Sequence, residues 1–256
     1  MKNPINIASS LAASLVTTPR GLMSDPAERQ PEFMLRLYEM ENCPHCRVVR
    51  EALTRLDLDA LILPCPKGGE RFRPEAEHIG GKQQFPLLVD QNTGRILYES
   101  VDIVHYLYAT YGKRSTLPKA LIKALNSTAA GVASALRMGR GMRARPSTAP
   151  TEPLELYSFE SSPFARLVRE RLCELEIPYQ LRNMGKAKLS DLVPPVVRRT
   201  AMPGYTAVGR NRQRLFERVG HVQVPFLADP NTDTEMFESS DIIAYLEQTY
   251  AIAEDE

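Results

Sequence analysis

The sequence predicts an α/β protein in which one structural unit occurs twice in tandem. Residues 37–53 match residues 156–172 at nine of seventeen positions, at an offset of 119. Residues 84–108 match residues 223–247 at twelve of twenty-five positions, at an offset of 139. Self-similarity of this kind indicates a duplicated unit, and 256 residues suffice for two domains of ordinary size. The two offsets differ by 20, so the second copy carries an insertion of that length.

Each copy is expected to begin with a short apolar strand, at 35–38 and at 154–157. A helix then begins at Pro44 or Pro163, because the N–H that proline lacks would be unbonded in a first helical turn anyway. The remaining elements follow in the same order in both copies. They are strands at 59–63 and 179–181, a loop and a helix, strands beginning at Pro86 and Pro225, hairpin turns at 92–94 and 231–233, and helices with Ser100 and Ser239 as N-caps. The order βαβ–α–ββα is that of a thioredoxin fold.

The connecting segments are rich in small residues and proline. A helix at about 118–138 is expected to bridge the two copies, followed by a linker from Pro146 to Pro153. Residues 8–18 have a similar composition, and either belong to the duplicated unit or form an unrelated Ala/Ser-rich helix. The expected organisation is an N-terminal helix and linker (1–33), a first domain (34–112), a linking helix and linker (113–153) and a second domain (154–256).

Cys43-Pro44-His45-Cys46 lies where a strand passes into a helix. The N–H groups and dipole of a helix N-terminus favour a thiolate, which is the attacking species in thiol–disulfide exchange. Cys46, one turn further on, is placed to resolve a mixed disulfide, and a protonated His45 would stabilise the thiolate. The alternatives are buried structural cysteines or half of a zinc site, although the sequence offers no second C-x-x-C or His pair to complete one.

Two further patterns occur in both copies. Phe85-Pro86 and Val224-Pro225 each place proline at the start of a central strand, where it removes a ladder donor. We expect cis peptide bonds there, with a trans edge-strand proline as the alternative. The second pattern is Glu-Ser-x-Asp at a helix N-terminus, which forms either an anion site or a simple cap. It comprises Glu99, Ser100 and Asp102, and then Glu238, Ser239 and Asp241.

Taken in order, C-P-x-C, x-P-x-L and E-S-x-x-I resemble the glutaredoxins and the N-terminal domains of glutathione transferases. The chain is similar above all to tandem glutathione-transferase N-domain proteins of plant plastids and bacteria. The segments that carry this resemblance are CPKGGERFRP, GGKQQFPLLVDQNTG, SPFARLVRERLCELEIP and QVPFLADPNT, and it covers about 34–111 and 154–251.

The resemblance implies glutathione-linked thiol–disulfide exchange at Cys43, with glutathione as cosubstrate and a disulfide-containing protein or small molecule as partner. The backbone of Phe85 would pair with the cysteinyl part of glutathione. Glu99 and Ser100 would hold its γ-glutamyl carboxylate, and Asp102 its ammonium group. The matching residues of the second copy are Val224, Pro225, Glu238 and Ser239.

The sequence departs from the family pattern in two ways. The all-helical domain that follows this unit in soluble glutathione transferases has no counterpart here, which puts classical transferase activity in doubt. The second copy also has Ser162 and Ala165 in place of the two cysteines. Ser162 either donates a hydrogen bond to a glutathione thiolate, as in a transferase or isomerase, or belongs to a copy that keeps only the fold. A third possibility is a non-catalytic protein that binds glutathione or serves in assembly.

Composition excludes some functions. The net charge of +1 argues against a dedicated nucleic-acid binder, and no apolar run has the length of a membrane span. Four cysteines are too few for a secreted disulfide scaffold of this size, so we expect a cytoplasmic protein. Residues 182–218 hold nine Lys and Arg against two acidic residues. This excess predicts a solvated surface loop, or alternatively a surface that attracts glutathione or an acidic partner.

Overall fold

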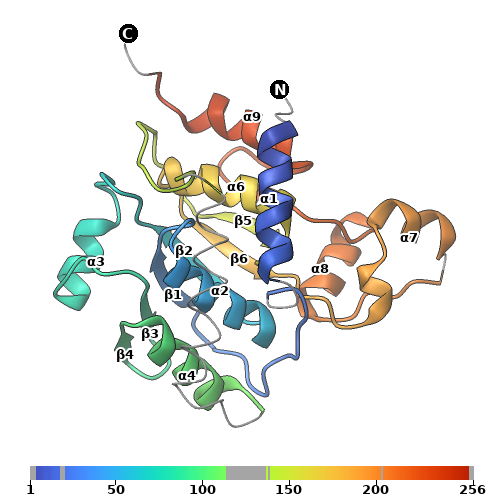
Figure 1. Cartoon of the computed structure of the whole chain (residues 1–256), viewed down its shortest axis with the longest axis horizontal. Coiled ribbons are helices and arrows are strands. Elements are labelled where there is room, and N and C mark those ends of the chain that lie inside the picture. The colour runs from blue at the N-terminus through green and yellow to red at the C-terminus, as the bar shows by residue number, and fades with distance from the viewer. Residues whose placement is uncertain (1–3, 18–20, 114–136, 138, 203, 254–256) are drawn as a thin grey trace.

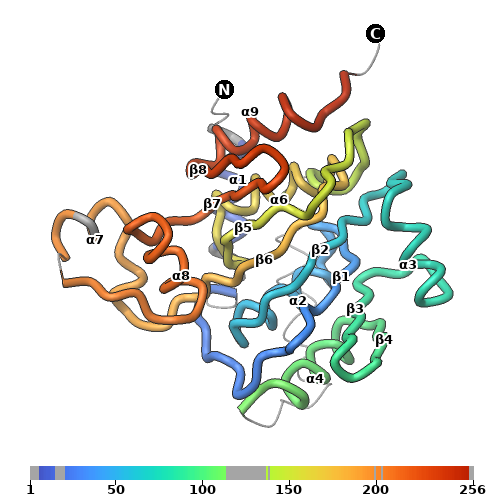
Figure 2. Tube along the Cα trace, turned by 180° about the vertical axis from the view of Figure 1, so that it is seen from behind, coloured from blue at the N-terminus to red at the C-terminus, as the bar shows by residue number. Residues whose placement is uncertain are grey.

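The computed structural model describes residues 4–17, 21–113, 137, 139–202 and 204–253. Its strands are β1 (Leu35–Glu39), β2 (Ala60–Pro64), β3 (Leu87–Asp90), β4 (Arg95–Leu97), β5 (Leu154–Ser158), β6 (Tyr179–Asn183), β7 (Phe226–Asp229) and β8 (Thr234–Phe237). They form one continuous sheet in the order β4-β3-β1-β2-β6-β5-β7-β8, which Figures 1 and 2 show from opposite sides. The described residues therefore contain two four-stranded units joined edge to edge.

The two units have the same strand pairing. In the first, β1 pairs in parallel with β2 and antiparallel with β3, which pairs with β4; the second unit repeats this with β5, β6, β7 and β8. The units meet through antiparallel β2 and β6, with Leu61 opposite Gln180 and Ala60 opposite Leu181. Leu61 and Gln180 are themselves equivalent at the offset of 119, so an approximate two-fold axis passes through this pair. The prediction of two tandem thioredoxin-like domains is confirmed.

Helices cover both faces of the sheet (Figure 1). They are α1 (Pro4–Thr17), α2 (Pro44–Leu56), α3 (Arg73–Gly80), α4 (Ser100–Tyr111), α6 (Pro163–Glu174), the 3₁₀ turn η1 (Leu189–Leu192), α7 (Pro195–Ala201), α8 (Arg210–Val219) and α9 (Ser239–Tyr250). Side chains alternate along each strand. Leu37 therefore packs into a core shared by α2, α4, α6 and α9, whereas Tyr38 packs with Ala76 of α3 on the opposite face. The first core runs without interruption through both units.

The N-terminal helix α1 lies against α6 of the second unit (Figure 1). The hydroxyl of Ser10 donates to the carbonyl of Pro163 at 2.6 Å, and Nη1 of Arg166 donates to the carbonyl of Ser10 at 2.9 Å. The helix expected at 8–18 is thus present but begins earlier, at Pro4. Most of the bridging helix expected at 118–138 lies outside the described residues. Among those described, no helix has the length and apolar character needed to cross a membrane.

The 20-residue insertion of the second unit consists mainly of η1 and α7, since α8 matches α3 at the offset of 139. The expectation that the basic residues of 182–218 form a solvated loop is wrong in part, because several of them lie in β6 and α8 and pair with carboxylates. Arg182 contacts Asp59 at 3.2 Å, and Arg212 contacts Asp191 at 3.1 Å. Arg182 and Arg210 thus fix the basic segment to Asp59 of the first unit, and the Arg212–Asp191 pair holds α8 to η1 within the segment.

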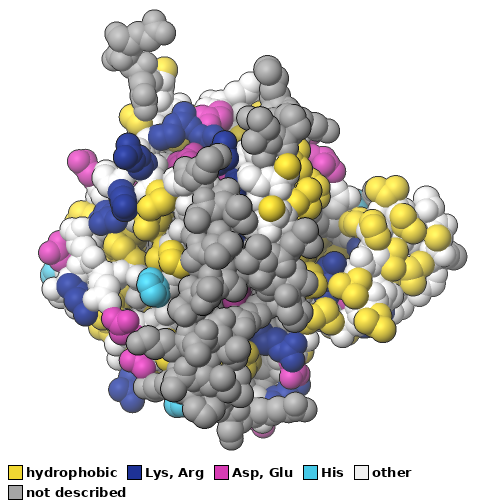
Figure 3. Space-filling model, viewed as in Figure 1, with side chains coloured by type: hydrophobic (Ala, Val, Ile, Leu, Met, Phe, Trp, Pro, Cys, Tyr) yellow, Lys and Arg dark blue, Asp and Glu magenta, His cyan; other side chains and the backbone are white. Residues whose placement is uncertain are grey.

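The exposed surface of the insertion is instead apolar. Leu189 is 79% exposed and Val196 is 64% exposed. Figure 3 shows apolar side chains gathered over this side of the molecule.

Candidate functional site

Cys43 lies at the junction of β1 and α2. It is the N-cap of α2, with φ −80° and ψ 123°, and its own N–H donates to the carbonyl of Met40 at 3.0 Å. The N–H of Cys46 points back at Sγ of Cys43, at 3.5 Å. Pro44 occupies the first turn, where a missing N–H costs nothing. The sulfur of Cys43 therefore stands where a side-chain acceptor caps a helix.

The two thiols of this motif have opposite acidities. A hydrogen bond from Cys46 lowers the pKa of Cys43 to about 6, against the opposing effect of burial; the backbone N–H groups of Cys46 and His45 and the charge of His45 act in the same direction. Burial, and then the neighbouring Cys43, raise the pKa of Cys46 well above its ordinary value. Near neutral pH, Cys43 carries the negative charge and Cys46 keeps its proton.

The other two cysteines differ from Cys43 in their surroundings. Cys65 and Cys173 are buried thiols, and burial raises the pKa of each. Both remain largely protonated near neutrality and are poor nucleophiles.

The sheet register brings the predicted ligand residues to the same end of the sheet as Cys43. Tyr38 of β1 pairs with Leu87 of β3, so Pro86 lies beside the end of β1, from which the chain runs on to Cys43. The Phe85–Pro86 peptide bond is cis, as expected, and so is Val224–Pro225.

The start of α4 reaches the same end of the sheet. The side-chain amide of Gln84, just before Phe85, donates to the carboxylate of Glu99. Gln223 and Glu238 repeat this contact at 2.7 Å.

The prediction that Ser100 and Ser239 are N-caps is wrong. Both are the first residues of their helices, and Glu99 and Glu238 are the caps. The reason lies in the backbone: the carbonyl of Glu99 accepts the first helical hydrogen bond, from Ile103, at 2.9 Å. Glu99 and Glu238 have φ of 61° and 66°, a conformation that is uncommon outside glycine. Neither makes a side-chain capping bond.

The second unit repeats the geometry without the sulfur. Ser162 caps α6 with φ −69° and ψ 114°, and its hydroxyl accepts from the N–H of Ala165 at 3.3 Å. Ser162 is 2% exposed, compared with 9% for Cys43. Its partner position is Ala165, so this unit offers no resolving thiol.

Comparison with known proteins identifies the family. The profile of the glutathione S-transferase N-terminal domain matches residues 37–115 and 156–254, well over half of the chain. The chain belongs to the glutathione S-transferase N-terminal domain family. Both of its units match, each over the strands and helices described above. No curated protein matches the chain significantly.

Solved structures of insect enzymes are also similar to part of the chain. A glutathione transferase of Bombyx mori is 29% identical over 34% of this chain and 39% of its own, with a TM-score of 0.28. A delta-class glutathione transferase of Nilaparvata lugens is 30% identical over 31% of this chain and 37% of its own, with a TM-score of 0.27. The Bombyx mori enzyme in complex with GTT matches at 30% identity over 33% and 39%, with a TM-score of 0.28. The matched region is about two-fifths of the length of these enzymes.

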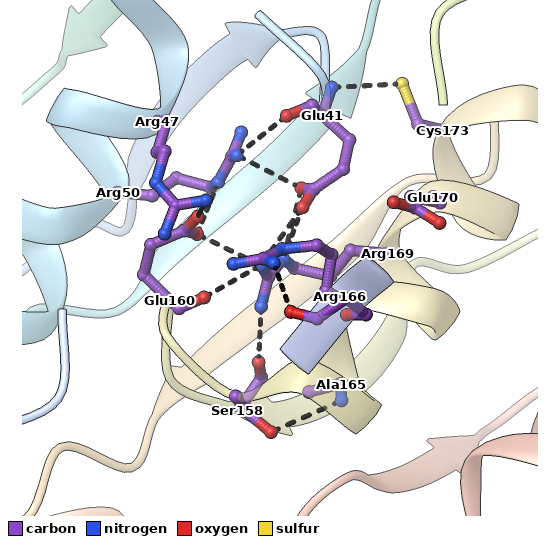
Figure 4. Close-up of polar contacts among 12 residues, drawn as sticks. Glu41, Arg47, Arg50, Ser158, Glu160, Ala165, Arg166, Arg169, Glu170 and Cys173 are labelled. Atoms are coloured by element: carbon purple, nitrogen blue, oxygen red, sulfur yellow. Dashed lines mark hydrogen bonds and ion pairs between the residues drawn. The ribbon is translucent and has the colours of Figure 1, made fainter. Parts of the chain in front are cut away.

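Sequence reasoning missed a buried network of charges beside Cys43, at the seam between the units (Figure 4). Arg169 of α6 donates to the carboxylate of Glu41 from Nη2 and from Nε, each at 3.0 Å. Arg50 of α2 donates to the carboxylate of Glu160 at 2.8 Å. These are equivalent residues at the offset of 119, so each unit supplies an arginine to the other's glutamate. The side chains are at most 3% exposed.

A third carboxylate breaks the symmetry of this network. Arg50 also binds Glu39, at the end of β1, whereas the equivalent Arg169 donates to the hydroxyl of Ser158 at 2.9 Å. Burial, with Glu41 and Glu160 nearby, raises the pKa of Glu39 to about 8 even though Arg50 opposes this. In Glu160 the arginines prevail over burial, and the pKa lies below its usual range.

Within the described part of the chain, no three His, Cys, Asp or Glu side chains are grouped so as to hold a metal ion. The buried carboxylates of Glu39, Glu41 and Glu160 bind arginines instead.

Proposed function

We propose that the protein is a glutathione-linked thiol–disulfide oxidoreductase, with Cys43 as nucleophile and Cys46 as resolving thiol. One observation carries this proposal: Cys43 caps α2, has a pKa near 6 and stands one turn from a thiol that keeps its proton. A thiolate that forms below neutral pH beside a second thiol is suited to attack a disulfide and then be released. Membership of the glutathione S-transferase N-terminal domain family supports glutathione as the cosubstrate.

The proposed reaction needs only the mixed disulfide and a second glutathione. The thiolate of Cys43 attacks the glutathione sulfur of a mixed disulfide; that S–S bond breaks, and the substrate leaves as a thiolate that takes a proton from water. The enzyme now holds a Cys43–glutathione disulfide. The thiolate of a second glutathione attacks the glutathione sulfur of this disulfide, which releases oxidised glutathione and regenerates Cys43. Alternatively Cys46 loses its proton and attacks Cys43, which releases reduced glutathione and leaves an internal disulfide.

The residues at the same end of the sheet are proposed to bind glutathione. The backbone of Phe85, held by Pro86, would pair with its cysteinyl unit as an added strand. The free N–H groups that begin α4, at Ser100, would hold the γ-glutamyl carboxylate. Asp102 would accept a hydrogen bond from its ammonium group, and so would Glu99, because the carboxylate of Glu99 would repel the γ-glutamyl carboxylate that the sequence assigned to it.

We propose a different part for the second unit. It lacks both thiols, and its Ser162 hydroxyl is buried and already accepts a helix N–H. We therefore treat it as a structural partner rather than a transferase site. A second candidate is glutathione binding there without turnover, at Val224, Pro225, Glu238 and Ser239. That candidate is favoured by the Gln223–Glu238 contact, which repeats Gln84–Glu99. Calorimetry distinguishes the structural role from glutathione binding at the second unit. Binding there predicts two glutathiones per chain, and a structural role predicts one.

The deciding experiment is intact-mass measurement after incubation with oxidised glutathione. We expect the wild type to gain one glutathione or to lose two hydrogens as an internal disulfide. Cys46→Ser should trap one glutathione, and Cys43→Ser should show neither change. A Cys43→Ser protein that reduced a glutathione mixed disulfide at the wild-type rate would falsify the proposal. The free thiols suit a reducing compartment, and we propose the cytoplasm.

A further inference from the structure

The loop that leads into Cys43 is held by the opposite unit. Glu41, two residues before the cysteine, has three polar groups, and each has a partner. Its carboxylate accepts from Arg169, and its N–H donates to Sγ of Cys173 at 3.4 Å. Both partners lie on α6. Its own unit contributes Arg50, whose Nη2 donates to the carbonyl at 2.9 Å and lies 3.3 Å from the carboxylate.

The equivalent loop before Ser162 is held in the same way in the reverse direction. The carboxylate of Glu160 accepts from Arg50, and its N–H approaches Oγ1 of Thr54 at 3.2 Å, both on α2. Its carbonyl accepts from Nη2 of Arg169 at 3.1 Å. Thr54 and Cys173 are therefore equivalent by position and by contact. Only one of the two loops ends in a cysteine.

We infer that the second unit is the positioning element of the Cys43 site, with Arg169 and Cys173 as its positioning residues. This deepens the proposed function and rests on it. Among the described residues, Arg169 and Cys173 both contact Glu41, and they act on Cys43 through it. The duplication keeps the second unit because its α6 completes the loop that presents the nucleophile.

The geometry of the cap makes Cys43 sensitive to this loop. Sγ of Cys43 lies 3.5 Å from the backbone nitrogen of Cys46, an ordinary length for a hydrogen bond to sulfur. A shift of the loop away from α2 would lengthen and weaken this bond, together with the one from the N–H of His45. Supporting contacts that hold a reactive group to within about 0.5 Å decide whether a site works. Removing a contact that holds Glu41 should therefore raise the pH at which the Cys43 thiolate forms.

The test compares two equivalent truncations. Cys173→Ala removes the acceptor of the Glu41 N–H, and Thr54→Ala removes the acceptor of the Glu160 N–H. The readout is the pH midpoint of Cys43 alkylation by iodoacetamide, followed by peptide mass. We expect Cys173→Ala to raise this midpoint by about 0.5–1 pH unit, the equivalent of one net hydrogen bond. Thr54→Ala also removes the hydrogen bond that Thr54 donates to Asn183 at 2.9 Å, so it should lose at least as much stability and still keep the wild-type midpoint. Cys173→Ser, which keeps an acceptor, should restore it.

Arg169→Met removes the other contact between α6 and Glu41 and should also raise the midpoint. If Arg169→Met does not fold, Cys173→Ala still tests the inference. The inference is overturned if Cys173→Ala leaves the midpoint unchanged, or if Thr54→Ala raises it equally. A wild-type midpoint in the ordinary cysteine range contradicts the proposed function itself. The two failures are therefore distinguishable.

Discussion

Glu41 and Arg169 are 128 positions apart and meet at 3.0 Å in the interior of the protein. Arg50 and Glu160 form the reciprocal contact, so the two units exchange charged side chains as the subunits of a symmetric dimer do. Burying such pairs gains little net stability over apolar residues, but removing one member leaves an uncompensated charge. We expect the network to favour this pairing of the two units over others.

Arg169→Met should strongly destabilise the protein, because Glu41 and Glu160 then share fewer cations in a dry interior. We expect the free energy of unfolding to fall by about 3–5 kcal/mol, measured by urea denaturation. The matched control is Arg145→Met, whose partner Glu247 is 31% exposed and also contacts Arg171. That variant should lose less than about 1 kcal/mol. Equal losses in the two variants would show that the buried ion pairs between the units contribute no more to stability than an exposed pair.

Glu39→Gln should change how stability depends on pH. In the folded state the pKa of Glu39 is raised to about 8, so the unfolded chain releases this proton first as pH rises. The contribution of Glu39 is fully present below its ordinary pKa, and declines from there up to about pH 8. The free energy of unfolding of the wild type, minus that of Glu39→Gln, should fall across this window and then level off. Urea denaturation at several pH values measures this difference. If the free energies of unfolding of the two proteins changed with pH in parallel, the raised pKa of Glu39 would be contradicted.

Cys46→Ala should raise the pKa of Cys43 from about 6 towards its ordinary value, because the side chain of Cys46 is the largest stabiliser of the thiolate. Cys46→Ser keeps a donor and should have a smaller effect. The ultraviolet absorbance of the thiolate, titrated against pH, reports the change. We also expect Cys46→Ser to reduce glutathione mixed disulfides when glutathione is the reductant, although it cannot form an internal disulfide. The thiolate assignment fails if Cys46→Ala titrates like the wild type.

Gln84→Ala should weaken glutathione use by the first unit, since Gln84 orients the carboxylate of Glu99. Losing one such contact costs about 0.5–1.5 kcal/mol, which corresponds to a rise of about 2–10-fold in the KM for glutathione. Gln223→Ala is the control, because it breaks the equivalent contact in the unit without cysteines. It should leave the KM unchanged. An equal rise for both variants would place glutathione at both units.

Much of the fold was predictable because both copies carry matching residues in the same order along the chain. Leu37 and Tyr38 are repeated as Leu156 and Tyr157, and both pairs lie in matching strands. Strand and helix boundaries were correct to within a few residues for the same reason: proline and alternating apolar residues act locally. The position of Cys43 at the start of a helix followed from Pro44 alone.

The seam between the units was not predictable from local patterns. Nothing near Leu61 in the sequence indicates that it pairs with Gln180. A signal was nevertheless present: Glu41 and Arg50 are repeated as Glu160 and Arg169 in the segment that both copies share. Identical charges kept in both copies suggest a contact that both copies make within the molecule. Which arginine meets which glutamate depends on tertiary geometry, as does the capping role of Glu99.

The pairing of β2 with β6 has a consequence for how this protein can be divided. Three residues of β2 pair with β6. A fragment ending before the second unit would leave β2 as an exposed edge strand, which can pair with other chains. It would also leave Arg50 without Glu160. Neither half is therefore a free-standing module, and shuffling or truncation experiments should treat the duplicated protein as indivisible.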